Sequence, residues 1–509
     1  MTSGRWPVPD AWEWVRSETI ADVVGGGTPR ADDESNFSTD GIPWITPADL
    51  TGYKSVYICR GRRDLSDKGI KGSGATLLPS GTVLFSSRAP VGYCAIAANA
   101  ISTNQGFKSL VLKGGISPEF VRYYLLSAKE YAESLASGTT FLELSAKRMS
   151  ELEIPLPPLP EQRRIVRKLD TLSACSTTAR AHLTAIEKLV ERYKESLRQQ
   201  AFVGVMSASW REHAKHDEDG LVLLDRVRHL HKTYWLQMLR EKMPVGRPTS
   251  SDAALLKKYQ APERLNETDQ PHGVPQTWTW AAAEEIVEPG TEIVYGIVQP
   301  GPRLENGIPY VRGMDIVNGV IQTGQLLKTS LEIAQKYDRA SLKGNDILLG
   351  IIRATKVAIV PPEIEGANIT QGTARFRPSC VISTEFLAHW LSSKTAQSWL
   401  HAKYRGIDMP GLNLRDVRRL PVPLPPLEEQ REIVRRIETA FAKIERLAAE
   451  AAKALQLLGH LDGRILAKAF AGDLVPQDPT DEPAETLLAR IRTERAAAPK
   501  TKRKRRTSA

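Results

Sequence analysis

The side chains best suited to chemistry in this sequence are hydrogen-bonding groups that recur in loops. Arginine can make two parallel hydrogen bonds to guanine, asparagine or glutamine can do the same to adenine, and lysine more often holds phosphates. Such residues lie between short β-branched runs in both halves of the chain, so they predict contact with DNA bases and backbone. The candidates are Arg30, Lys54, Arg62, Arg63, Arg88, Asn104, Gln105 and Lys108 in the first half, and Tyr295, Arg312, Lys328, Arg353, Lys356, Gln371 and Arg405 in the second.

Arg88 and Arg353 are favoured within this set because they occupy nearly equivalent places after the strand-like runs GTVLFSSR and GNDILLGIIR. For every candidate taken alone, a solvated charge or a structural hydrogen bond is the competing interpretation. The prediction therefore concerns the two groups of residues more than any single member.

No pattern typical of catalysis accompanies these residues. The sequence has no Walker GxxxxGK[ST] motif, no (N/D)PP(Y/F) motif of amino-methyltransferases and no HExxH. The loop GGGTP from Gly25 is not followed by a helix-opening pattern, and PADL from Pro47 lacks the second carboxylate of a nuclease site. We expect a binding protein without a cofactor of its own, whose partners carry out any chemistry.

A metal site is not expected either. The four cysteines are scattered, without the paired spacing of a zinc site. The cluster formed by His213, His216, His229 and His231 has no second cluster to complete it, so solvated surface histidines are the better interpretation.

Charge is compatible with a nucleic-acid partner but does not prove one. The chain of 509 residues has a net charge of +10, and six of the positive charges lie in the terminal stretch PKTKRKRRTSA, which leaves +4 for everything before it. This tail is expected to be disordered and to add unspecific phosphate affinity. No apolar run approaches the ~18 residues of a membrane span, and the first residues lack a signal-peptide core, so a cytoplasmic protein is expected.

The sequence contains one unit written twice. VPDAWEW from Val8 recurs as VPQTWTW, GIPWITPADL from Gly41 recurs as GIPYVRGMDI, and Gln105-Gly106 returns as Gln371-Gly372, each 266 positions later. LPPLPEQRRIVRKL from Leu156 recurs after 268 positions as LPPLEEQREIVRRI. Each half combines a Gly- and Pro-punctuated, strand-rich module of about 140 residues with a long segment of helical pattern.

Prolines mark the boundary between these two regimes. Pro155, Pro157 and Pro158 favour an extended approach, and Pro160 with Glu161 suits the first turn of a helix. A polyproline ligand for an SH3-type partner is the alternative interpretation of PLPPLP. Its duplication directly before a long helix favours the structural role.

Each helical segment carries a heptad seam of ten positions. In the first copy these are Ile165, Leu169, Leu172, Ser176, Ala179, Leu183, Ile186, Val190, Tyr193 and Leu197; adding 268 gives Ile433, Ile437, Ala440, Ile444, Leu447, Ala451, Ala454, Leu458, Leu461 and Ile465. Such a seam indicates a coiled coil. An intramolecular antiparallel pair would bury both seams, place the modules at opposite ends about a pseudo-twofold axis, and form a ruler of roughly 50 Å. Packing on the helix's own module or on another copy is the alternative.

These features together resemble the DNA-specificity subunit of type I restriction-modification systems. The resemblance covers nearly the whole chain, and it is carried by the LPPLxEQxxIVxx motif before a coiled-coil helix, with GGTPR, GIPWITPADL and NQGF as further landmarks. It implies an α+β fold, with two strand-rich target-recognition domains separated by two long helices in an antiparallel coiled coil. The expected segments are a first target-recognition domain (1–155), a central helix (156–204), a linker that wraps back along the coil (205–272), a second target-recognition domain (273–423), a distal helix (424–472) and a C-terminal segment with the basic tail (473–509).

The resemblance also implies partners. Each domain would read one half of a bipartite site in double-stranded DNA, with half-sites about one helical turn, ~34 Å, apart. The helices would dock two methylation subunits, restriction subunits would join the full complex, and S-adenosylmethionine, ATP and Mg would be bound by those partners. A stand-alone DNA-binding protein or a protein scaffold without a modification partner is the alternative.

Overall fold

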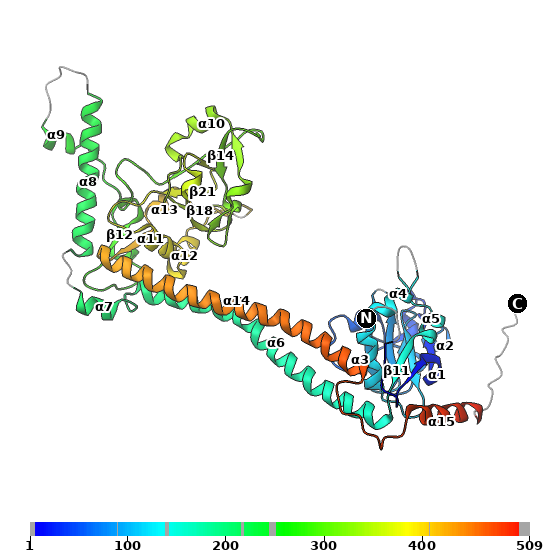
Figure 1. Cartoon of the computed structure of the whole chain (residues 1–509). Helices are drawn as coiled ribbons and strands as arrows, with labels where there is room; N and C mark the ends of the chain where they lie inside the picture. The colour runs from blue at the N-terminus through cyan, green and yellow to red at the C-terminus, as the bar shows by residue number, and fades with distance from the viewer. Residues whose placement is uncertain are drawn as a thin grey trace. The chain divides into compact units, whose positions relative to one another are not determined.

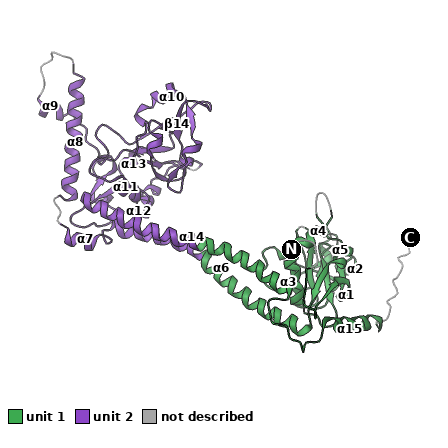
Figure 2. Ribbon diagram, viewed as in Figure 1, with its two compact units in different colours: residues 1–184, 451–509 green, residues 185–450 purple. Residues whose placement is uncertain are grey.

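The chain forms two compact units. The structure is a computed structural model and describes residues 6–88, 90–137, 142–214, 218–243, 251–406 and 408–497, so the predicted basic tail lies outside the described residues. One unit comprises residues 1–184 with 451–509 and the other residues 185–450 (Figure 2). Each contains one strand-rich module and portions of both long helices (Figure 1).

The module of the first unit is built on two sheets. A five-stranded sheet has the order β2 (Ala21–Gly25), β10 (Lys108–Leu112), β7 (Val83–Ser87), β8 (Val91–Ala97) and β5 (Tyr57–Ile58), and a four-stranded sheet has the order β3 (Phe37–Ser38), β6 (Arg63–Leu65), β4 (Ile42–Ile45) and β9 (Ser102–Thr103). Alternation along β7 buries Val83 and Phe85 with helix α3 (Pro118–Ser127), and Leu84 with the second sheet. Both faces of the larger sheet are therefore covered.

The second module repeats this plan. Its four-stranded sheet has the order β13 (Val294–Tyr295), β21 (Thr373–Phe376), β18 (Ile347–Gly350) and β19 (Val357–Ile359), and a three-stranded sheet the order β17 (Leu327–Thr329), β14 (Ile308–Val311) and β20 (Asn368–Ile369). The register confirms the internal repeat: Trp44 pairs in parallel with Ser102, and Tyr310 pairs in parallel with Asn368, 266 positions later in both strands.

A short antiparallel strand pair leads from each module into its long helix. Strand β1 (Glu13–Arg16) pairs with β11 (Glu153–Leu156), and β12 (Thr279–Ala282) pairs with β22 (Pro421–Leu424). The prolines thus lie in extended backbone, and helices α6 (Leu159–Phe202) and α14 (Leu427–Ala471) begin where the motif predicts.

The glutamine of each LPPLxEQ motif is buried and anchors the helix to the module before it. Gln162 accepts a hydrogen bond from the Ser117 N–H (3.1 Å) and donates to the Pro157 carbonyl (3.0 Å). Gln430 repeats both contacts with Ser383 (2.8 Å) and Pro425 (2.9 Å). The motif is therefore a structural element, as its duplication indicates.

The Ala-Phe ending of each long helix completes the core of the other repeat's module. In the first unit Phe470 packs against Phe120 and Tyr124, with ring centroids 5.5 and 5.2 Å apart. In the second, Phe202 packs against Phe386 and Trp390 at 5.3 and 5.1 Å. Each module therefore requires the helix end of the opposite repeat.

The two long helices pack antiparallel within each unit. Arg180 pairs with Asp462 in the first unit and Lys194 with Glu445 in the second, both at 2.9 Å. Most predicted seam positions are buried or half-buried, but Tyr193, Leu447 and Leu461 are exposed, by 56%, 60% and 49%. The prediction was wrong at these three positions. At these places the next residue along the helix, Lys194, Ala448 or Asp462, is half-buried instead, and Lys194 and Asp462 form the ion pairs between the helices. The departures are local, because Leu197 and Ala451 beyond them are buried as predicted.

The segment after α6 does not run back along the coil as expected. Helix α8 (Gly220–Glu241) packs on β12 and β22, with Leu223, Leu224 and Val227 in the core of the second module. Arg228 reinforces this contact through Glu285 (2.7 Å). These apolar residues at helical spacing form a stripe on α8 that packs into the core of the second module.

Candidate nucleic-acid interface

A hollow of about 480 Å³ lies in the second module where the β18–β19 turn meets the start of β21. It gathers four of the seven residues predicted for this module: Arg312, Arg353, Lys356 and Gln371. The other lining residues come from these loops and from the segments after β13, β14 and α12 (Lys394–His401), and are Ile297, Val298, Gly313, Met314, Ile352, Ala354, Thr370, Gly372 and Met409.

Arg353 and Gln371 are the freest hydrogen-bonding groups of this hollow. Both are exposed, and neither side chain has a hydrogen-bond partner among the described residues. Arg353 has a positive φ of 65°, and its N–H donates to the Pro410 carbonyl at 2.8 Å. Left-handed backbone at a large side chain is uncommon and clusters at functional sites, so this conformation supports the choice of Arg353 as a candidate site residue.

The two other cations of the hollow are partly engaged. Arg312 donates from Nε and Nη2 to Asp315 (3.0 and 2.7 Å), and these hydrogen bonds raise the pKa of Arg312. Lys356 Nζ donates to the Ile316 carbonyl at 2.8 Å and meets no carboxylate among the described residues. Lys356 therefore brings a positive charge to the hollow, suited to a phosphate.

In the first module the corresponding loops bring together Arg88, Gln105 and Lys108. Arg88 and Lys108 both face Glu143, at 3.6 and 3.4 Å, and Lys108 also donates to the Gln105 carbonyl at 3.4 Å. The Gln105 side chain is exposed, whereas Asn104 turns inward and accepts from the Gly106 N–H at 2.9 Å. Gln105 thus matches Gln371, but one of the two positive charges beside it is offset by Glu143, a residue that the sequence did not predict for this site.

The strand register refines the comparison of Arg88 with Arg353. Ser87 and Ile351 make the same backbone bonds, to Gly106 and Gly372, so the counterpart of Arg88 is Ile352. Arg353 therefore follows one residue later. When the two modules are aligned, the arginines lie one residue apart, so they are neighbours and not equivalents. The two modules therefore differ in the side chains at this edge.

The loops GGGTP and GTEIVYG differ in sequence, but each has a glycine packed closely against the backbone of a neighbouring turn. A Cβ on Gly26 would lie 2.0 Å from the Asn104 carbonyl oxygen, and one on Gly296 would lie 1.9 Å from the Ile369 oxygen. Only glycine allows this approach. The next N–H group of each loop also bonds to this backbone: Gly27 donates to the Thr103 carbonyl and Ile297 to the Ile369 carbonyl. Each loop therefore lies against the turn that carries the exposed glutamine, Asn-Gln-Gly in the first module and Thr-Gln-Gly in the second.

The other predicted residues lie elsewhere in their modules. Those of the second module lie outside the hollow lining: Tyr295 packs on the core, Lys328 donates to the Glu305 carbonyl (2.9 Å) and Arg405 pairs with Asp416 (3.4 Å). Those of the first module are exposed: Arg30, Lys54, Arg62 (3.7 Å from Asp49) and Arg63, which stacks on Phe37.

Several hollow residues were not predicted from sequence. Met314 and Met409 are exposed by 68% and 56%, and Val298 by 41%, beside the polar groups. Apolar contact with the thymine methyl group is a recognised means of base reading. The sequence signal for Met314 is its place two residues after Arg312, in the short 3-10 helix η5 (Gly313–Asp315).

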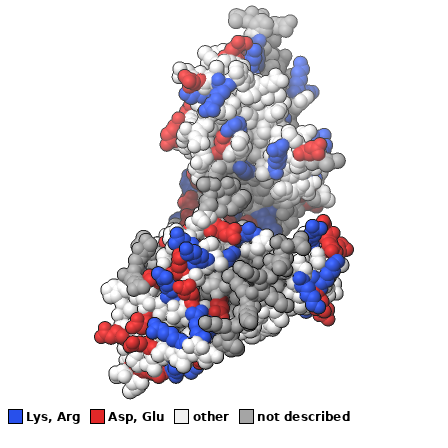
Figure 3. All heavy atoms as spheres, turned by 90° about the vertical axis from the view of Figure 1, so that its right-hand side faces the viewer, with Lys and Arg blue, Asp and Glu red and all other residues white. Residues whose placement is uncertain are grey.

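The wider surface carries both signs of charge. On the face seen in Figure 3, lysine and arginine are interspersed with aspartate and glutamate and do not form one basic field. Among the described residues there is no group of three His, Cys, Asp or Glu side chains placed to hold a metal ion. No helix in the described ranges has both the length and the apolar character needed to cross a membrane.

Comparisons with known proteins agree with this architecture. The model of the type I restriction modification DNA specificity domain matches residues 9–188 and again 302–454. The chain is 29% identical, over 97% of its length and 95% of the relative, to the type I restriction enzyme EcoBI specificity subunit of Escherichia coli. It is 41% identical, over 32% of its length and 38% of the relative, to the MjaIX specificity subunit of Methanocaldococcus jannaschii. A solved structure from work on assembly of the type I R-M system shares the fold, with a TM-score of 0.56 at 19% identity over 92% of this chain and 100% of that one.

Proposed function

Because the chain belongs to the family of type I restriction modification DNA specificity proteins, we propose that its two modules read the two halves of one split DNA target. Proteins of this family are the non-catalytic specificity subunits of type I restriction-modification systems, and DNA target recognition follows from the membership. In this proposal Gln371 and Arg353 contact bases of one half-site, and Gln105 with Arg88 contacts bases of the other. Lys356 and Lys108 hold phosphates.

One observation carries the proposal: the two modules place an exposed glutamine, Gln105 or Gln371, at the same turn and surround it with different chemistry. Around Gln105 lie an arginine and a lysine that face Glu143. Around Gln371 lie Arg353 and Lys356, which meet no carboxylate among the described residues, together with exposed methionines and Arg312, which pairs with Asp315. The two modules share one backbone arrangement but differ in the side chains around the glutamine. Such a pair suits an asymmetric DNA target whose two halves have different short sequences.

The paired helices supply the fixed spacing in this proposal. Spacer length in DNA follows the length of α6 and α14, and the helices offer docking surfaces for two methylation subunits. Restriction subunits complete the assembly, and S-adenosylmethionine, ATP and Mg are bound by those partners. The remaining predicted residues, Arg30, Lys54, Arg62, Arg63, Asn104, Tyr295, Arg312, Lys328 and Arg405, stay proposed DNA contacts of the modules.

The test is long-read mapping of methylated adenines in host DNA with and without this gene. The expected result is a split motif, two short specific halves around a fixed gap, that disappears on deletion and returns with the wild-type gene. Unchanged methylation, with neighbouring methylation and restriction genes intact and expressed, would contradict the proposal. A stand-alone DNA-binding protein or protein scaffold would then be the better description.

A further inference from the structure

A second cavity of the second module is separate from the hollow around Arg353. It has a volume of about 490 Å³ and lies at the other end of β21, between the loops at residues 290–294 and 338–343. Its walls carry four cations, Arg339, Lys343, Arg375 and Arg377, and two carboxylates, Glu292 and Asp338. None of these residues is among the proposed DNA contacts.

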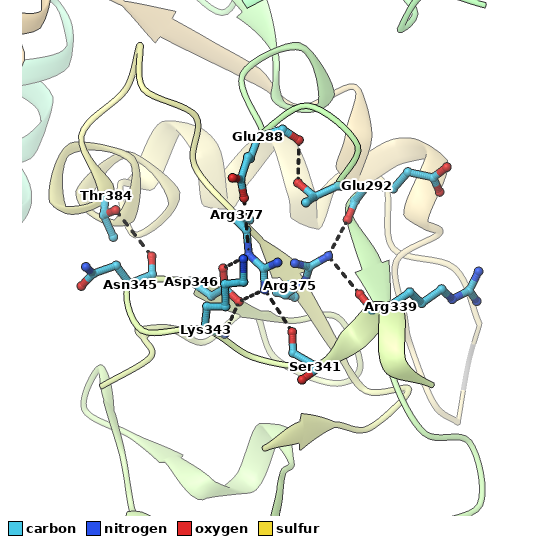
Figure 4. A network of polar contacts seen from close by, with 11 residues as sticks. Glu288, Glu292, Arg339, Ser341, Lys343, Asn345, Asp346, Arg375, Arg377 and Thr384 are labelled. Carbon is cyan, nitrogen blue, oxygen red and sulfur yellow. Dashed lines mark hydrogen bonds and ion pairs between the residues drawn. The ribbon is translucent and has the colours of Figure 1, made fainter. Parts of the chain in front are cut away.

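Arg375 is the unusual member of this wall. It is 2% exposed, and its Nη2 donates to the backbone carbonyls of Glu292 (3.2 Å) and Arg339 (3.1 Å), as Figure 4 shows. Its Nε and Nη1 are buried and have no hydrogen-bond partner among the described residues. A buried guanidinium that lacks partners is costly, unlike a surface arginine in water.

The neighbouring carboxylates do not remove this cost. Asp346 is held by Arg377, whose Nε and Nη2 donate to its two oxygens at 2.8 Å, and Asp346 also accepts from the Lys343 N–H at 2.9 Å (Figure 4). Glu292 reaches out to Arg418 at 3.1 Å. Among the described residues, Arg339, Lys343 and Arg375 therefore have no carboxylate in an ion pair.

A purely structural role would make Arg375 a clasp that joins two loop carbonyls. That role uses one nitrogen of the guanidinium and leaves the positive charge without compensation. Burial, followed by the nearby charge of Arg377, lowers the pKa of Arg375, which reflects the same unfavourable setting. A clasp alone could be made by a neutral donor, so the retained charge and the open cavity beside it require a further explanation.

We propose that this cavity binds a compact oxyanion of the phosphate type, with Arg339 and Lys343 at the rim and the charge of Arg375 behind it. An anion here lies beside the exposed cations Arg339 and Lys343 and compensates the charge of the buried guanidinium. The shared chemistry is a tetrahedral oxyanion, which is supplied either by free phosphate or by a phosphate of the DNA backbone.

The repeat provides an internal comparison. Ser109 occupies in β10 the place of Arg375 in β21, 266 positions later, as Gln105 and Gln371 do at the turn before them. The first module therefore has no guanidinium at this position. The oxyanion site is a property of the second module alone.

The first experiment measures thermal unfolding of the full-length protein, free of DNA, in chloride buffer titrated with inorganic phosphate at constant ionic strength. Phosphate should raise the unfolding midpoint with the concentration dependence of one site, so that the midpoint climbs with the logarithm of phosphate concentration above the dissociation constant. The rim variant Arg339→Gln with Lys343→Gln should weaken the apparent affinity about tenfold, equivalent to ~1.4 kcal/mol. Both side chains are exposed, so this variant should fold.

Two further variants sharpen the test. Lys336→Gln removes an exposed lysine of helix α10 (Leu331–Lys336) outside the cavity and should leave the phosphate affinity unchanged. Arg375→Met removes the buried charge and should abolish the phosphate effect; if this variant does not fold, the rim variant decides. An unfolding midpoint of the wild type that does not respond to phosphate, or an equal response of the rim variant, would overturn the proposal.

A second measurement separates the two sources of the oxyanion. DNA affinity of the wild type and the rim variant is measured over a range of chloride concentrations. If the site holds a backbone phosphate, the rim variant loses affinity on all sequences, its salt slope falls by about 1, and free phosphate competes with DNA. If it holds a free ion, DNA affinity is unchanged and the DNA-bound protein still binds phosphate.

Discussion

The indole N–H of Trp12 donates a hydrogen bond of 2.9 Å to a carboxylate oxygen of Glu161, at the first turn of α6. Trp278 makes the same bond, at 3.0 Å, to Glu429 of α14. The second oxygen of each glutamate accepts from the segment after the opposite helix: from Gln477 in one unit, and from Ser207 with Arg211 in the other. Each glutamate thus joins the start of its own repeat to the end of the other.

Glu429→Ala should lower the free energy of unfolding of the second unit by about 3 kcal/mol. Glu429 is fully buried, and its removal leaves the charge of Arg211 and the indole N–H of Trp278 without their acceptor. Urea unfolding of the full-length protein followed by tryptophan fluorescence measures the loss. Glu428→Ala, one residue away and exposed, is the control and should change stability by no more than about 0.5 kcal/mol. Equal effects of the two variants would contradict the role of Glu429.

Sequence patterns predicted those parts of the fold that local chemistry dictates. The repeat and the placing of Pro160 and Glu161 in the first helical turn follow from duplication and proline geometry, whereas the burial of the Glu-Gln pairs was not predicted. The predicted seam also holds far along the helices, at Leu197 and Ala451, which are 9% and 7% exposed. At Tyr193, Leu447 and Leu461 the packing in three dimensions turned a neighbouring residue toward the partner helix, and a heptad pattern alone does not determine that choice.

The types of residue in the candidate site were predictable from the sequence, but which of them lie together was not. Gln371 and Arg353 were identified from residue type and loop position, and the structure brings them to one hollow with Arg312 and Lys356. Glu143 was missed because its partners, Arg88 and Lys108, are more than thirty positions away and are brought near by β-bridges. Tertiary pairing of this kind leaves no local pattern in a single sequence.

Gln371→Ala should relax recognition at one half-site only. A bidentate amide contact to a base discriminates by roughly 1–3 kcal/mol, so the preference for the correct base should fall about tenfold or more at one position. Binding of the full-length protein to a library with single substitutions in both half-sites measures this. Gln105→Ala is the reciprocal control and should relax a position in the other half. Loss at both half-sites with either variant would argue against separate reading by the modules.

Lys356→Gln should weaken DNA binding uniformly instead of relaxing a base preference. Its ammonium group is exposed in the hollow and bonds only to the Ile316 carbonyl, which suits a phosphate contact. The slope of log affinity against log salt should become smaller by about 1. The exposed Lys336→Gln should keep the wild-type slope. A changed base preference with an unchanged slope would assign Lys356 to base reading.

His389 should make the second unit sensitive to mild acid. Burial, followed by the charge of Arg198, lowers the pKa of His389 to about 4, although Glu385 acts in the opposite direction. As pH falls below about 6.5 the unfolded chain binds a proton at this residue and the folded one does not, so stability is lost down to about pH 4. From pH 7 to pH 5 the loss should be about 1–2 kcal/mol.

Denaturant unfolding at the two pH values measures this loss. His389→Gln should remove that share of the pH dependence, because glutamine does not titrate. His213→Gln changes an exposed histidine and should retain the wild-type dependence. If His389→Gln and the wild type lose stability in parallel, another group controls the acid response.

The seam of α6 and α14 should control the gap between half-sites. Ala451 is 7% exposed and Leu183 is half-buried, both in the first unit, so Leu183→Glu with Ala451→Glu places two like charges in the packed seam. Burying unpaired charge should cost several kcal/mol locally and loosen the helix pair. We expect the preference of the full-length protein for one DNA spacer length over spacers one or two base pairs longer or shorter to fall by about tenfold, ~1.4 kcal/mol.

Leu447→Glu adds a charge to the same helix at a position that is 60% exposed and should keep the preference. If the double variant binds the half-sites with an unchanged spacer preference while its seam is loosened, as judged by hydrogen exchange along α6 and α14, the helices do not act as the ruler.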